Sequence, residues 1–327
     1  MTDGRALSGS QAEGGISYIS AVCALLLVSL AASLVPADTE TSLYIVSYVS
    51  TIILQLCFLL AAVLPYRATR TLPLYGFSRP SFKACAAAPA VTVISLVSFY
   101  GAAAVFGMLL SAVGYEPSGS VSVDQPLTVA LTVLSTVIVA PVCEERLMRG
   151  SCLSSLYAAL GARRSGRRTL LAVALCGLVF ALIHTRPEQT VYQFLFGAVL
   201  AYFTIRTGSV IPAVIAHALN NAIGIVLELP ATGEAIDGFF VRVFSVWYGA
   251  VIAIAVSAAL CVGGAFALRA LIRSLGNGQP EKLRTTGESI PVSGGDGDVV
   301  TVAVLGALGL AVTAVLWTGN LIVGISG

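Results

Sequence analysis

The chain has 327 residues, of which 57% are hydrophobic and only 10% are charged, and its formal net charge is +2. A soluble domain of this length would carry about a quarter charged residues, so the composition excludes a soluble protein. We therefore expect an integral membrane protein in contact with the lipid bilayer, with no nucleic acid among its partners.

Apolar stretches long enough to cross a bilayer follow one another along the chain. A membrane-spanning helix needs about 20 apolar residues, so we expect an all-α, polytopic transmembrane helical bundle of about 8–9 spans. The stretches at 170–184 and 190–205 are short, and their ends are the least sharply defined. The candidate spans are residues 16–35, 43–64, 84–113, 127 to the segment around 144, 170–184, 190–205, 210–229, 239–268 and 299–323.

These stretches also divide the chain into regions. Residues 274–298 are rich in glycine, serine and charge, which predicts a flexible linker rather than a folded domain. The predicted regions are a cytoplasmic N-terminal tail (1–15), N-terminal transmembrane helices (16–126), a helical core (127–230), a further transmembrane helix (231–273), the cytoplasmic linker (274–298) and a C-terminal transmembrane helix (299–327).

Basic residues fix the expected orientation. Almost all of them follow the second, fourth, sixth and eighth candidate spans, whereas the alternate loops are acidic apart from Arg186. By the positive-inside rule, the N-terminus is cytoplasmic and the C-terminus lies outside. A composition rich in alanine, valine and arginine and poor in lysine indicates a prokaryotic cell membrane.

Four charges stand at the end of the fourth span, in the sequence PVCEERLMRG (141–150). Glu145 and Arg149 are four residues apart, so they share a helix face and can form an ion pair. Glu144 points about 100° away and has no such partner, which leaves it available as a catalytic base. The alternative is that the four charges only anchor the helix at the cytoplasmic interface.

The chain contains two histidines, and both lie in candidate spans. An intramembrane histidine can simply pack against a neighbouring helix, but His217 shares a face with Asn221, and residue counting places His184 level with Glu144. We therefore predict that Glu144, His184 and His217 lie within about 8 Å of a common point that opens to the cytoplasmic side. Glu145 is expected to point away from that point, toward Arg149.

Three short motifs in this order carry a family resemblance. EERLMR fits the pattern EExxxR, FALIH fits FxxxH, and HALNN fits HxxxN. The region 127–230 thus resembles the CAAX protease and bacteriocin-processing (CPBP, Abi-type) intramembrane proteases and, within them, type II CAAX prenyl endopeptidases. Met148 departs from the family pattern, which often has an aromatic residue before the arginine.

The resemblance implies a role for each matching residue. Glu144 would activate water with the help of His184, and Glu145 and Arg149 would form a supporting pair. Phe180 would shape the site, whereas His217 and Asn221 would stabilise the oxyanion or lie near a metal.

The expected function is an intramembrane endopeptidase that hydrolyses peptide or membrane-protein substrates with a glutamate-activated water. A divalent metal such as zinc, held by Glu144, His184 and His217, is as compatible with these residues as a metal-free mechanism, although no HExxH motif is present. Two alternatives belong to other classes. One is a non-proteolytic scaffold or regulator of the same fold, and the other is a transporter that uses intramembrane Glu and His.

Overall fold

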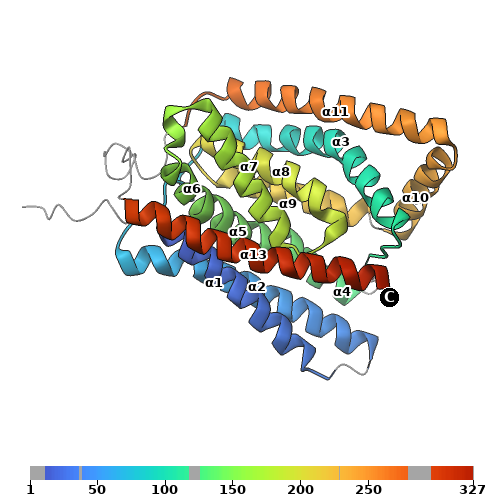
Figure 1. Cartoon of the computed structure of the whole chain (residues 1–327), viewed down its shortest axis with the longest axis horizontal. Coiled ribbons are helices and arrows are strands. Elements are labelled where there is room, and N and C mark those ends of the chain that lie inside the picture. Colours follow the sequence, from blue (N-terminus) through green and yellow to red (C-terminus); the bar gives the residue numbers. More distant parts are fainter. Residues whose placement is uncertain (1–11, 37–38, 118–125, 228, 279–295, 327) are drawn as a thin grey trace, which may run out of the picture.

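The computed structural model describes residues 12–36, 39–117, 126–227, 229–278 and 296–326. Every element in these ranges is a helix, and the long helices run along the long axis of the molecule (Figure 1). The predicted polytopic helical bundle is confirmed. Most of the predicted tail and of the predicted linker 274–298 lies outside the described residues.

Three long helices begin the chain. They are α1 (Ala12–Ser33), α2 (Glu40–Thr69) and α3 (Phe82–Ala112). A capping box starts α2, in which the hydroxyl of Thr39 accepts a bond from the Ser42 amide and the Ser42 hydroxyl accepts one from the Thr39 amide. The Ser81 hydroxyl caps α3 in a similar way by accepting from the Ala84 amide. These caps give hydrogen-bond partners to backbone N–H groups at the starts of α2 and α3, which have no partner within the helix.

The fourth membrane crossing is a single rod of changing helical type. It runs through α4 (Pro126–Thr132), a π-helical segment η1 (Val133–Val139), α5 (Ala140–Glu145), a second π-helical segment η2 (Arg146–Leu153) and α6 (Ser154–Ala159). Such π-helical turns are rare, and they are found mostly at functional sites. The two glutamates of the PVCEERLMRG motif lie on α5, between them.

The remaining helices complete the bundle. After a 3₁₀ turn η3 (Ala162–Arg164) come α7 (Gly166–Ile183), the 3₁₀ turn η4 (Pro187–Gln189), α8 (Thr190–Thr207), α9 (Ile211–Leu227), α10 (Pro230–Phe244), α11 (Trp247–Ser274) and α13 (Asp296–Ser326). The crossing of α7 and α8 is close, because a Cβ at Gly177 would lie 2.7 Å from the Phe194 carbonyl oxygen. Small residues permit such close helix packing in membranes.

Seven of these helices are long and apolar enough to cross a membrane, and α9 is a shorter apolar helix. The predicted stretch 190–205 is present as α8 but is not among the seven. Its helix contains polar residues such as Gln193 and Arg206, and Phe196, Leu200 and Phe203 in it are fully buried. A helix enclosed by other helices does not face lipid, so it need not be uniformly apolar.

The predicted span 239–268 begins too early. The backbone of Val246 is extended, with φ −120° and ψ 135°, and it separates α10 from α11. Residues 239–244 therefore belong to a different helix, and the crossing starts at Trp247. An apolar run alone does not reveal this break, because both sides of it are hydrophobic.

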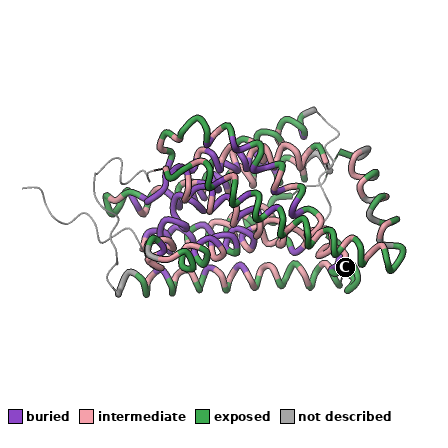
Figure 2. Tube along the Cα trace, turned by 90° about the horizontal axis from the view of Figure 1, so that it is seen from above, coloured by how far each residue is buried: buried purple, intermediate pink, exposed green. Residues whose placement is uncertain are grey.

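Burial divides the bundle into an interior and a periphery (Figure 2). The buried share of the most apolar window is 44% in α7 and 39% in the crossing 127–159, but only 11% in α11. Exposed leucines and valines cover the peripheral helices, as expected where side chains meet lipid. The interior helices carry the conspicuous motifs of the sequence.

Candidate active site

The Glu145 side of α5 is fully enclosed. The Nη1 atom of Arg149 donates to Oε1 of Glu145 at 2.7 Å, and both side chains are 0% exposed. The Nη2 atom of Arg149 donates to the backbone carbonyl of Gly197 on α8 at 3.0 Å. The structure thus contains the ion pair expected from the i,i+4 spacing, and this pair also ties η2 to α8.

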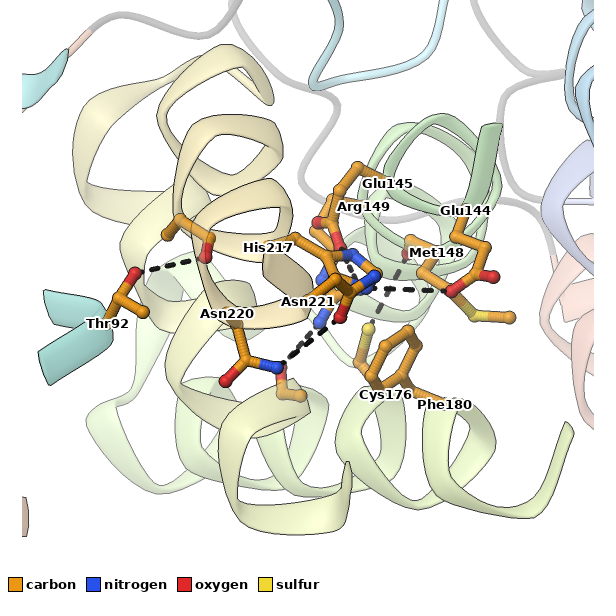
Figure 3. Close-up of polar contacts among 12 residues, drawn as sticks. Thr92, Glu144, Glu145, Met148, Arg149, Cys176, Phe180, His217, Asn220 and Asn221 are labelled. Carbon is orange, nitrogen blue, oxygen red and sulfur yellow. Dashed lines mark hydrogen bonds and ion pairs between the residues drawn. The ribbon is translucent and has the colours of Figure 1, made fainter. Parts of the chain in front are cut away.

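Glu145 was predicted to point away from the site, and this prediction is wrong, because Glu145 also contacts His217. The Nδ1 atom of His217 lies 2.9 Å from Oε1 of Glu145, the same oxygen that Arg149 contacts (Figure 3). Periodicity places Glu145 correctly beside Arg149 but says nothing of a side chain from α9. The pair therefore orients a site residue rather than standing apart from the site.

Glu144 lies on the other side of α5 and faces both histidines. Its Oε2 atom is 3.8 Å from Nε2 of His184 and 3.9 Å from Nε2 of His217. The three groups come from α5, the end of α7 and α9, and they lie within the predicted 8 Å of a common point. Among the described residues, no donor reaches the buried Oε2 atom.

The outer nitrogens of the two rings fix their tautomers. Nδ1 of His217 faces a carboxylate oxygen, and Nδ1 of His184 lies 2.6 Å from the Phe180 carbonyl oxygen, so both Nδ1 atoms are donors. In a neutral ring, Nε2 then carries a lone pair. With both rings neutral, two nitrogen lone pairs and the Oε2 atom of Glu144 face one another.

Phe180 packs against three charged or titratable groups of the site. Its ring packs edge-on against His184 and His217, with centroids 4.8 and 5.6 Å apart. The guanidinium carbon of Arg149 lies 4.5 Å from the centre of the same ring, within the range of a cation–π contact. One aromatic side chain thus packs against both imidazoles, and its shaping role stays a prediction.

Asn221 hydrogen-bonds a backbone carbonyl of the fourth crossing that lacks a backbone partner. The Ala140 amide bonds to the Ser135 carbonyl, five residues earlier. In the same register, the partner of the Thr136 carbonyl would be the amide of Pro141, which has no N–H. The Nδ2 atom of Asn221 donates to the Thr136 oxygen at 2.8 Å instead. One of its two N–H groups therefore holds α9 against η1, and the other is left for a further acceptor.

Sequence reasoning missed three polar contacts of the site. Nε2 of Gln55 donates to Oε1 of Glu144 at 2.7 Å. The hydroxyl of Tyr192 donates to Oδ1 of Asn220 at 2.5 Å, and Nδ2 of Asn220 lies 3.4 Å from Oδ1 of Asn221. The available signals were an amide in the middle of the second apolar stretch and a second asparagine in HALNN.

The spacing of the residues predicted as metal ligands lies between that of a zinc site and that of a shared water. Zinc ligands at about 2.0–2.2 Å in tetrahedral geometry stand about 3.3–3.6 Å apart, and two atoms that share one water at hydrogen-bonding distance stand about 4.5 Å apart. Oε2 of Glu144 lies 3.8 and 3.9 Å from the two Nε2 atoms. Within the described part of the chain, no group of three or more His, Cys, Asp or Glu is arranged to hold a metal.

The fold and the site together define a polytopic helical membrane protein with a buried cluster of glutamates and histidines. Residues 126–223 match the family model described as Rce1-like, type II CAAX prenyl endopeptidase Rce1-like. The resemblance predicted from the three motifs is thereby confirmed, and the matched segment contains all seven predicted site residues. No curated protein and no solved structure matches the chain.

Proposed function

We propose that the protein is an intramembrane endopeptidase in which Glu144 activates the attacking water. The observation that carries the proposal is the convergence of Oε2 of Glu144 with Nε2 of His184 and Nε2 of His217. Three acceptors that face one region need a donor between them, and a water molecule has two protons to offer. Its remaining lone pairs are then free to attack a carbonyl carbon.

The residues supply the proton transfers of peptide hydrolysis. As the water oxygen bonds to the carbonyl carbon, its proton passes to Oε2 of Glu144, and the carbonyl oxygen becomes an oxyanion. The second N–H of Asn221 is a donor for that oxyanion. When the C–N bond breaks, Glu144 returns the proton to the leaving amine, so the products are a carboxyl group and an amine.

The pairing of Glu145 supports this division of labour. Glu145 is neutralised by Arg149 at 2.7 Å, whereas the hydrogen bond that Glu144 receives from the described residues is a neutral amide N–H of Gln55. A carboxylate bound to a guanidinium is a poor proton acceptor, because the ion pair stabilises its charged form. Glu144 is therefore the better base of the two.

A metal-assisted reaction through the same groups would require the three atoms to move slightly closer together, and a shared water would require them to move slightly apart. Metal content separates the two mechanisms without an activity assay. The zinc content of the purified protein is measured by mass spectrometry, with His184→Ala as the variant. Stoichiometric zinc that disappears in His184→Ala would favour the metal-assisted mechanism.

The proposed substrates are peptides or membrane-associated proteins that reach the site from within the bilayer. The matching family is described by its action on prenylated CAAX proteins, so a peptide with a prenylated cysteine near its C-terminus is one candidate. The cytoplasmic opening of the site and the cytoplasmic N-terminus, both expected from the arginine-rich loops, remain predictions.

The test compares protein termini in membranes that contain the wild type or Glu144→Gln, each expressed in cells that lack the native chain. Gln keeps the shape of the side chain and its contact with the surrounding helices, but it cannot accept the proton. We expect at least one N-terminus to vanish in Glu144→Gln while the variant stays in the membrane. A synthetic peptide that spans that terminus then serves as the assay substrate.

Glu116→Gln is the matched control, since it makes the same chemical change in the exposed loop after α3. If every terminus persists in Glu144→Gln, the peptidase proposal is wrong. Solute uptake by proteoliposomes that survives this substitution would then favour a transporter, and the absence of both activities would favour a scaffold.

A further inference from the structure

Gln55 contacts the proposed base from outside the region that matches the family model. It lies in the middle of α2 and is 5% exposed, whereas the match begins at residue 126. Its Nε2 atom donates to Oε1 of Glu144 at 2.7 Å, a length typical of hydrogen bonds to ionised acceptors. Helix α2 thus adds a polar contact to a site otherwise built from α5, α7 and α9.

The buried side-chain amide of Gln55 lowers the stability of the folded protein. Its flanking residues, Leu54 and Leu56, are apolar, and no donor among the described residues reaches its buried Oε1 atom. A buried polar atom without a partner is destabilising. The contact with Glu144 is the hydrogen bond that the described residues offer to this side chain. An apolar residue at this position would avoid the unpaired Oε1 atom, so packing alone does not explain the amide.

The two oxygens of Glu144 consequently have different surroundings. Oε1 accepts the N–H of Gln55, and Oε2 faces the two imidazoles. We propose that Gln55 is a positioning residue that fixes the Glu144 carboxylate, so that Oε2 alone accepts the proton of the water. This inference rests on the proposed peptidase function and adds to it a residue of α2.

The contact can persist through the whole reaction. When Oε2 takes the proton, Oε1 becomes the carbonyl oxygen of the acid, which still accepts the N–H of Gln55. A basic residue at this position would hold the carboxylate equally well, but it would stabilise the charged form of Glu144 and weaken the base. A neutral donor fixes the geometry and avoids an ion pair.

The test measures kcat and KM on the peptide identified with Glu144→Gln. Gln55→Met keeps the length of the side chain and removes the donor, and we expect kcat to fall about 10- to 100-fold, as for other residues that orient a reactive group. KM should change by less than about threefold, because the lost contact matters in the transition state. Leu54→Met, one position earlier on α2, is the control and should keep wild-type kcat.

The outcomes separate this inference from the proposed function. Wild-type kcat in Gln55→Met, together with an inactive Glu144→Gln, would overturn the role of Gln55 and leave the peptidase proposal intact. If Gln55→Met does not accumulate, Gln55→Asn retains the amide but cannot reach Glu144, and full activity in it would also overturn the inference. Loss of both variants from the membrane would mean that Gln55 is needed for folding rather than for positioning.

Discussion

The two sides of α5 place adjacent carboxylates in opposite surroundings. On one side, Glu145 meets a guanidinium at 2.7 Å and an imidazole N–H at 2.9 Å. On the other side, Glu144 receives the amide N–H of Gln55 and faces the Nε2 atoms of two imidazoles. The contrast shows that two adjacent buried glutamates can be held differently, one by a guanidinium and one by a neutral amide.

The largest effect is expected on the Glu144 side. Glu144→Gln removes the base and leaves the Arg149 pair untouched, so we expect turnover to fall on the order of 10²–10⁴-fold. The thermal midpoint should stay close to that of the wild type. Peptide cleavage and thermal unfolding in the same detergent provide the measurements. Equal turnover by Glu144→Gln would mean that the two sides do not differ in function.

On the Glu145 side, stability should suffer first. Glu145→Ala or Arg149→Ala leaves an uncompensated buried charge, which costs on the order of 3–5 kcal/mol. The double variant should lose less than the sum of the two single variants. Thermal or denaturant unfolding of the four proteins checks this. If the single variants keep wild-type stability and their losses of activity add up in the double variant, both residues act in the chemical step.

A smaller effect on stability is expected at Asn221, and its size should depend on whether residue 141 is the proline that lacks an N–H. Asn221→Ala leaves the Thr136 carbonyl without its donor, which costs about 1–3 kcal/mol. In a Pro141→Ala background, residue 141 regains an N–H, so the same substitution should cost less. A double-mutant cycle on the unfolding free energy measures the coupling. An identical cost in both backgrounds would show that Asn221 does not compensate for the proline.

The smallest effect is expected at Phe180, which touches both sides. Phe180→Leu keeps an apolar side chain but removes the ring below Arg149, at a cost of about 1 kcal/mol in stability. Turnover should also decrease, because the edges of both imidazoles lose their support. If only stability changes, Phe180 belongs to the Glu145 side alone.

Much of this arrangement follows from spacing within single helices. The four-residue interval predicts the Glu145–Arg149 contact. Counting residues along the two helices predicts that Glu144 and His184 lie at the same level. Contacts between helices distant in sequence are not encoded in such spacing. The approach of His217 to Glu145 and of Gln55 to Glu144 depends on helix rotation and crossing, which periodicity does not determine.

The boundaries of the spans show the same limit. Hydrophobic runs identify the helices, because lipid requires about 20 apolar residues in each crossing. They do not reveal the extended residue Val246 inside a largely apolar stretch, nor the π-helical segments beside α5. Both depend on local hydrogen-bond registers that apolar side chains tolerate equally well.

The contacts of α13 have a consequence for the order of biosynthesis. Thr185, directly after His184, has a left-handed backbone with φ 54°, which is unfavourable for a β-branched residue. Its carbonyl accepts a bond from Nδ2 of Asn320 at 2.7 Å, and Trp317 bonds to Thr190 nearby. Both contacts come from the helix that is synthesised after every other described one.

The residues between His184 and Asn320 take roughly 7–27 s to translate at ordinary ribosomal speeds. During that interval, the turn that carries His184 has its own backbone hydrogen bonds but lacks the contact between Thr185 and Asn320. The left-handed residue beside His184 is therefore held from outside its turn only after the last described helix has been made.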